Sequence, residues 1–173
     1  MRPNRHQTWI TVASVIAQRS TCLRRAVGCV LTNARGHVLA TGYNGRASGL
    51  PHCNEWVPYP DPLPPNFVCS TPAHWPHACA GSWSPSGKNL DGCEAIHAEQ
   101  NALLQCRDVH AIETCYVTVS PCVTCTKLLL NTSCREIVFL EPYAHEAPAR
   151  ELWEKAGRRW TRLPTLKNPE EVA

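Results

Sequence analysis

The sequence predicts an α/β fold of three layers, α/β/α, with a central mixed sheet of about five strands. Segments rich in β-branched and apolar residues alternate along the chain with segments whose apolar residues recur at helical spacing. At 173 residues the chain has the usual length of one domain with a proper core. We therefore expect a single domain over residues 1–173.

The first predicted elements are a helix and a hairpin. Residues 6–20 carry an apolar stripe at helical spacing, which predicts an amphipathic helix over one face of the sheet. Residues 26–32 and 37–43 are apolar runs joined by a short turn that contains Gly36, which predicts a β-hairpin.

The remaining elements follow in the C-terminal half. Residues 114–119 and 136–141 have the composition of two further strands. Residues 147–156 predict a helix, which Gly157 caps, and residues 158–163 predict a short edge strand. Between the two halves lies an insertion over about 51–92, whose first 35 residues contain nine prolines and show no clean period. A loop of this length in a compact domain needs something to order it.

Composition excludes several classes of protein. The net charge is +3, with scattered basic residues, so we expect a small anionic ligand and no long nucleic acid. No apolar leader or membrane-spanning run occurs, which predicts a cytoplasmic location in spite of 11 cysteines. Four of these cysteines lie inside apolar patterns and are expected to pack in the core: Cys29, Cys106, Cys115 and Cys134.

One combination of motifs carries the chemistry. His97 and Glu99 are followed 22 residues after Glu99 by Pro121, Cys122 and Cys125. One imidazole and two thiolates suit a zinc ion and leave its fourth tetrahedral position open for water. We predict that His97 and Glu99 lie in the opening turns of one helix. Ser120 is the expected N-cap of a second helix, with Pro121 at its first position.

This spacing is the signature of zinc-dependent nucleobase deaminases, in which the glutamate moves protons and does not bind the metal. In such a mechanism Glu99 takes a proton from the activated water, C4 of the base is attacked, and Glu99 passes protons to N3 and to the departing amine. The alternative is a closed structural zinc module without chemistry, but such a site has no use for Glu99.

A second, structural zinc is predicted from cysteines outside the regular apolar patterns, at the two ends of the insertion. Its proposed ligands are Cys22, Cys53, Cys79 and Cys93. The fourth ligand is open, because several other residues could replace Cys79: His52, Cys69, His74 and His77. Free thiols in a reducing compartment are the other interpretation.

From about Cys22 to Tyr143 the chain resembles the deoxycytidylate (dCMP) deaminase family. The resemblance is carried by Thr-Gly-Tyr-Asn-Gly at 41–45, Ser48 with Gly49, His52 with Cys53, the run 93–102, and Ser-Pro-Cys-Val-Thr-Cys at 120–125. It implies a cytidine-deaminase-like fold and conversion of dCMP to dUMP and ammonia, and it leaves open whether dCMP with a C5 substituent is also a substrate. Several members also hold a noncatalytic zinc at positions like Cys22 and Cys53.

The resemblance also implies roles for individual residues. Asn44 would bind the 3′-hydroxyl of the deoxyribose, and Arg24 or Arg25 would hold the 5′-phosphate. The remaining substrate-binding candidates are Ala98, Ser120, whose region lines the base pocket, and Tyr143.

Regulation and assembly are expectations from the same resemblance. The family often has a proline where this chain has Ala47, in the region of the effector site for dCTP and dTTP, so a nucleotide effector with Mg²⁺ stays open. We expect a homo-oligomer, either a dimer or a hexamer, and no membrane partner. A deaminase acting on tRNA or single-stranded DNA shares the zinc motif, but it would more often carry a basic groove.

Overall fold

The computed structural model describes residues 2–55, 78–85, 87–89 and 91–164. Its central sheet has five strands in the order β2-β1-β5-β6-β7. The strands are β1 (Gly28–Thr32), β2 (Val38–Tyr43), β5 (Thr114–Val119), β6 (Glu136–Glu141) and β7 (Arg159–Arg162). β1 pairs antiparallel with β2 and β5, whereas β5, β6 and β7 are parallel. The predicted mixed sheet, including its C-terminal edge strand, is confirmed.

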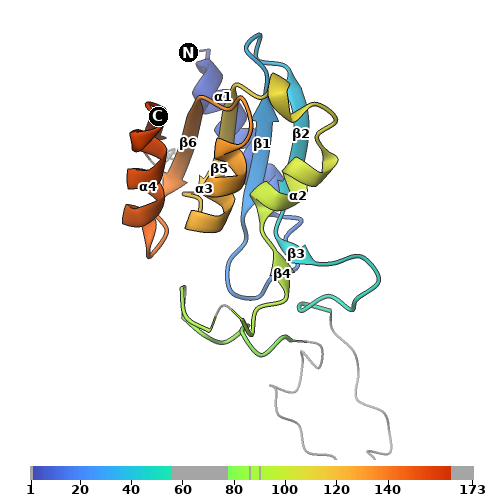
Figure 1. Ribbon diagram of the computed structural model, residues 1–173. Helices are drawn as coiled ribbons and strands as arrows, with labels where there is room; N and C mark the ends of the chain where they lie inside the picture. The colour runs from blue at the N-terminus through green and yellow to red at the C-terminus, as the bar shows by residue number, and fades with distance from the viewer. Residues whose placement is uncertain (1, 56–77, 86, 90, 165–173) are drawn as a thin grey trace, which may run out of the picture.

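Helices cover both faces of this sheet (Figure 1). α1 (Arg5–Ala17) packs against β1 and β5 on one face. The other face carries α2 (Ala98–Gln105), α3 (Val123–Leu130) and α4 (Glu146–Lys155), and a 3-10 turn spans Val109–Ala111. Buried apolar side chains form one cluster under each layer, which confirms the three-layer architecture. The four cysteines predicted for the core are all buried.

Two short strands, β3 (Gly45–Arg46) and β4 (Ala95–Ile96), pair antiparallel beyond the end of β2. The insertion begins after β3 and returns at β4, so the pairing of these two strands brings its flanking residues together. Much of its sequence, including Cys69, His74 and His77, lies outside the described residues. Among the residues that are described, no helix has the length and apolar character that crossing a membrane requires.

Three predicted helix ends differ from the structure. α1 stops at Ala17 rather than residue 20, because Ser20 turns away to hydrogen-bond Asn44. α2 starts at Ala98, so His97 is its N-cap. α3 starts at Val123 with Cys122 as its N-cap, and the predicted N-cap role of Ser120 is therefore wrong.

Glycine allows α2 to lie close to the sheet. A β-carbon at Gly42 would overlap the backbone of α2 at Ala98 and Ala102. Without it, the start of α2 approaches β2 closely, and Asn101 donates a hydrogen bond of 2.7 Å to the Tyr43 carbonyl. This packing fixes the position of Glu99, the second residue of α2.

Candidate metal centre and substrate pocket

Two helix starts place the three predicted zinc ligands together. His97 precedes α2, and Cys122 and Cys125 lie at the start of α3. His97 Nδ1 is 3.5 Å from Cys122 Sγ and 3.4 Å from Cys125 Sγ. Zinc bonds of about 2.3 Å to sulfur and about 2.05 Å to nitrogen, at a tetrahedral angle, separate the two ligand atoms by about 3.6 Å. The cluster therefore has the dimensions of a zinc site that uses Nδ1.

Cys122 and His97 form a thiolate–imidazolium pair, whose proton a bound zinc ion would displace. A hydrogen bond from Cys125, with help from His97, lowers the pKa of Cys122 to about 4. Cys122 in turn raises the pKa of His97 to about 9. Cys122 is therefore a thiolate at neutral pH, as zinc coordination requires. Within the described part of the chain, this is the only group of three or more potential ligands gathered closely enough to hold a metal.

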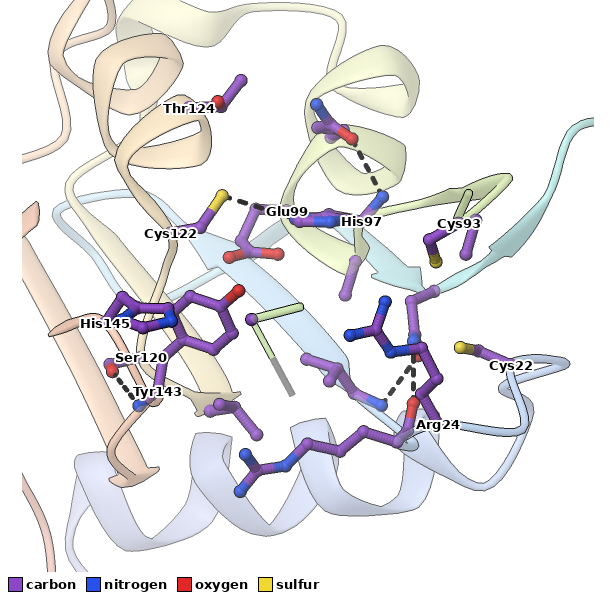
Figure 2. A pocket seen from close by; sticks show the side chains of 18 of the residues that line it. Cys22, Arg24, Cys93, His97, Glu99, Ser120, Cys122, Thr124, Tyr143 and His145 are labelled. Atoms are coloured by element: carbon purple, nitrogen blue, oxygen red, sulfur yellow. Dashed lines mark hydrogen bonds between the residues drawn. The ribbon is translucent and has the colours of Figure 1, made fainter. Parts of the chain in front are cut away.

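Glu99 is the carboxylate of the site. Its side chain is only 4% exposed, and burial raises its pKa. Figure 2 shows the carboxylate between Cys122 and His97, facing the pocket. A buried carboxylate with a raised pKa is suited to accept and return a proton.

A pocket of about 440 Å³ opens in front of these residues. Its lining includes all six residues predicted to bind substrate: Arg24, Arg25, Asn44, Ala98, Ser120 and Tyr143. The structure also adds residues that the sequence did not single out, among them Gly87 and His145. His145 packs edge-on against Tyr143, with 6.1 Å between ring centroids. The sequence signal that could have identified His145 as a pocket residue was its position two residues after Tyr143 in the same loop.

The side chain of Asn44 is held mainly by the protein itself. Its Oδ1 accepts hydrogen bonds from the Ser20 hydroxyl at 2.7 Å and from the Val27 amide at 2.8 Å. Its Nδ2 donates to the Arg25 carbonyl at 2.8 Å. Asn44 therefore braces the loop that carries Arg24 and Arg25, and one N–H of its amide is left for a ligand.

Ser120 braces the opposite side of the pocket. Ser120 is only 2% exposed. Its hydroxyl donates a hydrogen bond to Glu146 at 2.8 Å and accepts one from the Tyr143 amide at 2.7 Å. These bonds fix the loop that presents Tyr143 and His145. They also explain why Ser120 does not cap α3.

The two candidate phosphate ligands have different partners. Arg25 forms an ion pair with Glu141 at the surface, where the Glu141 side chain is 59% exposed. Arg24 Nη2 instead donates to two backbone carbonyls of the insertion, those of Pro85 at 2.6 Å and Lys88 at 2.8 Å.

The four cysteines predicted for a structural zinc lie as two pairs. Interaction with Cys22 lowers the pKa of Cys93 to about 5. Cys53 and Cys79 form the other pair, and both are buried without a disulfide. Among the residues described, no three of these sulfur atoms lie within 4.8 Å of one another.

Comparison with known proteins agrees with this geometry. The model for the zinc-binding region of cytidine and deoxycytidylate deaminases matches residues 3–141. The deoxycytidylate deaminase of Schizosaccharomyces pombe is 33% identical over 90% of this chain. The chain spans only 43% of that protein and 44% of its Saccharomyces cerevisiae counterpart.

Phage proteins match over most of their length. The deoxycytidylate deaminase of Mycobacterium phage D29 is 32% identical over 80% of this chain and 95% of its own length. The fold resembles that of the dCMP deaminase of cyanophage S-TIM5, crystallised with dCMP and dUMP, with a TM-score of 0.65 and 21% identity over 94% of this chain and 99% of the other. With a family model matched over most of its length, and the His97, Cys122 and Cys125 cluster formed, this chain belongs to the cytidine and deoxycytidylate deaminase family.

Proposed function

We propose that the protein hydrolyses dCMP to dUMP and ammonia. The observation that carries the proposal is a buried Glu99 beside a zinc-sized cluster of one imidazole and two thiols, at the inner end of a pocket with two arginines. Relatives named deoxycytidylate deaminase support dCMP as the substrate. A pocket of about 440 Å³ suits a free nucleotide rather than a long polymer.

Each residue of the site has a separate role in the proposed reaction. His97, Cys122 and Cys125 would hold a zinc ion, which would lower the pKa of a bound water. Glu99 accepts a proton from the attacking water and delivers it to N3 of the cytosine, then carries the proton of the new C4 hydroxyl to the departing amine. Ala98 and Tyr143 line the space for the nucleotide, and the remaining N–H of Asn44 is available to the deoxyribose.

Ammonia release from a panel of substrates tests this proposal. The purified zinc-loaded protein is given dCMP, 5-methyl-dCMP, dCTP, deoxycytidine and CMP. We expect dCMP to have the highest kcat/KM of the four compounds without a C5 substituent. tRNA and single-stranded DNA are assayed beside this panel. Turnover of either with none of dCMP would favour the polymer deaminase, and no turnover at all would favour a structural zinc module.

Arg25 is the residue we expect to bind the 5′-phosphate of dCMP. The Arg25→Ala variant loses a charge-assisted hydrogen bond to dCMP, so its kcat/KM should fall about tenfold to a hundredfold. Deoxycytidine lacks the phosphate, and its kcat/KM should change little. Arg150→Ala, which removes an exposed arginine on α4, is the control. Equal losses on both substrates would contradict a phosphate contact.

We also propose that Cys22, Cys53, Cys79 and Cys93 hold a structural zinc. The donor chemistry supports it, because four unbridged thiols lie in two interacting pairs. The two pairs must approach to form a tetrahedral site, in which sulfur atoms lie about 3.8 Å apart. A dimeric or hexameric assembly, a cytoplasmic location and an effector bound with Mg²⁺ stay predictions.

A further inference from the structure

The insertion forms part of the substrate pocket through one short turn, of which the structure describes residue 85 and residues 87–89. Lys88 donates its amide to the Pro85 carbonyl at 3.0 Å, which closes the turn, and Gly87 within it lines the pocket. Gly87 has a φ of +80°, a conformation that favours glycine. A β-carbon there would overlap the imidazole of His145. The turn therefore lies directly against the loop that carries His145 and Tyr143.

Arg24 holds the same turn from the other side. Its Nη2 donates to the carbonyls of Pro85, two residues before Gly87, and of Lys88, the residue after it. Figure 2 shows Arg24 on the side of the pocket with Cys22 and Cys93, and His145 with Tyr143 on the opposite side. The turn thus spans the pocket between the two sides. Charge-assisted hydrogen bonds to two carbonyls are a strong attachment for a segment with little regular structure.

We propose that Arg24 is a positioning residue that clamps the end of the insertion across the pocket, and that the insertion in this way completes the substrate-binding wall. This assigns the two neighbouring arginines different tasks. Arg25 meets the substrate phosphate, and Arg24 holds protein backbone. The proposal rests on the proposed deamination for its kinetic test, but not for its test by proteolysis.

The kinetic test compares Arg24→Ala with Arg25→Ala on dCMP and deoxycytidine. Loss of a wall affects every ligand of the pocket, so Arg24→Ala should raise KM for both substrates by a similar factor, about tenfold. kcat should fall much less, because Glu99 and the metal ligands lie on α2 and at the start of α3. A loss confined to dCMP would overturn the proposal and make Arg24 a phosphate ligand.

The second test follows the turn itself in the zinc-loaded protein. A lysine-specific protease cleaves after the exposed Lys88, and cleavage after Lys127 on α3 serves as the internal reference. Release of the turn should speed cleavage at Lys88 about tenfold or more in Arg24→Ala. Arg25→Ala and Arg150→Ala should leave that rate unchanged.

The two tests fail separately. An unchanged cleavage rate at Lys88 in Arg24→Ala would show that the clamp does not hold the turn, whatever the enzyme acts on. Absence of turnover in the unaltered protein would instead refute the proposed function, and the protease test would still decide the role of Arg24. Thermal unfolding of each variant shows whether a change is confined to the turn.

Discussion

Replacing Glu99 by glutamine is expected to reduce kcat on dCMP by at least about 10²-fold, the lower range for loss of general acid–base catalysis. Glutamine has nearly the same shape as glutamate but cannot accept a proton from water. Because Glu99 is 4% exposed and its carboxylate does not belong to the ligand cluster, the fold and the zinc content should be retained. Steady-state ammonia release and elemental analysis of the variant measure both quantities.

Glu151→Gln is a matched control, since Glu151 is an exposed residue of α4. Its turnover should equal that of the unaltered protein. Near-normal turnover in Glu99→Gln would show that another group moves the proton. A variant that loses both zinc and activity would show that Glu99 supports the metal site.

The sheet and the catalytic cluster could be predicted because both depend on local signals. The strands at 114–119 and 136–141 have the predicted bounds, since β-branched and apolar residues fill each of them. The spacing of His97, Cys122 and Cys125 predicts a zinc site, because these residues lie where two helices begin at one edge of the sheet. A catalytic zinc site needs these residue types in this order.

The walls of the pocket could not be predicted in the same way. Asn44 and Ser120 were expected to face the substrate, and both do line the pocket, but most of their hydrogen bonds hold neighbouring loops. Which side chain braces a loop depends on contacts between residues that are far apart in sequence. Arg24 illustrates this point, because its partners Pro85 and Lys88 lie more than 60 residues away, inside the insertion. Neither partner contributes a side chain that a motif could reveal.

Removing two of the proposed structural ligands is expected to halve the zinc content of the protein. The unaltered protein should bind two zinc ions per chain, and the double variant Cys22→Ser with Cys93→Ser should bind one. Cys22 and Cys93 form one interacting pair, so their loss removes half of the proposed tetrahedral set while His97, Cys122 and Cys125 stay intact. Cys106→Ser is the control, because that thiol lies at the end of α2 and donates to the Asp108 carbonyl.

The number of zinc ions per chain in the unaltered protein tests the structural site even if the double variant does not fold. Two zinc ions require a second site in addition to the catalytic cluster. One zinc ion, with every catalytic ligand intact, would leave the two cysteine pairs as free thiols and remove the proposed structural site. If the second zinc is present, its loss should also speed cleavage after Lys88, because Cys79 and Cys93 fix the part of the insertion that reaches the pocket at Gly87.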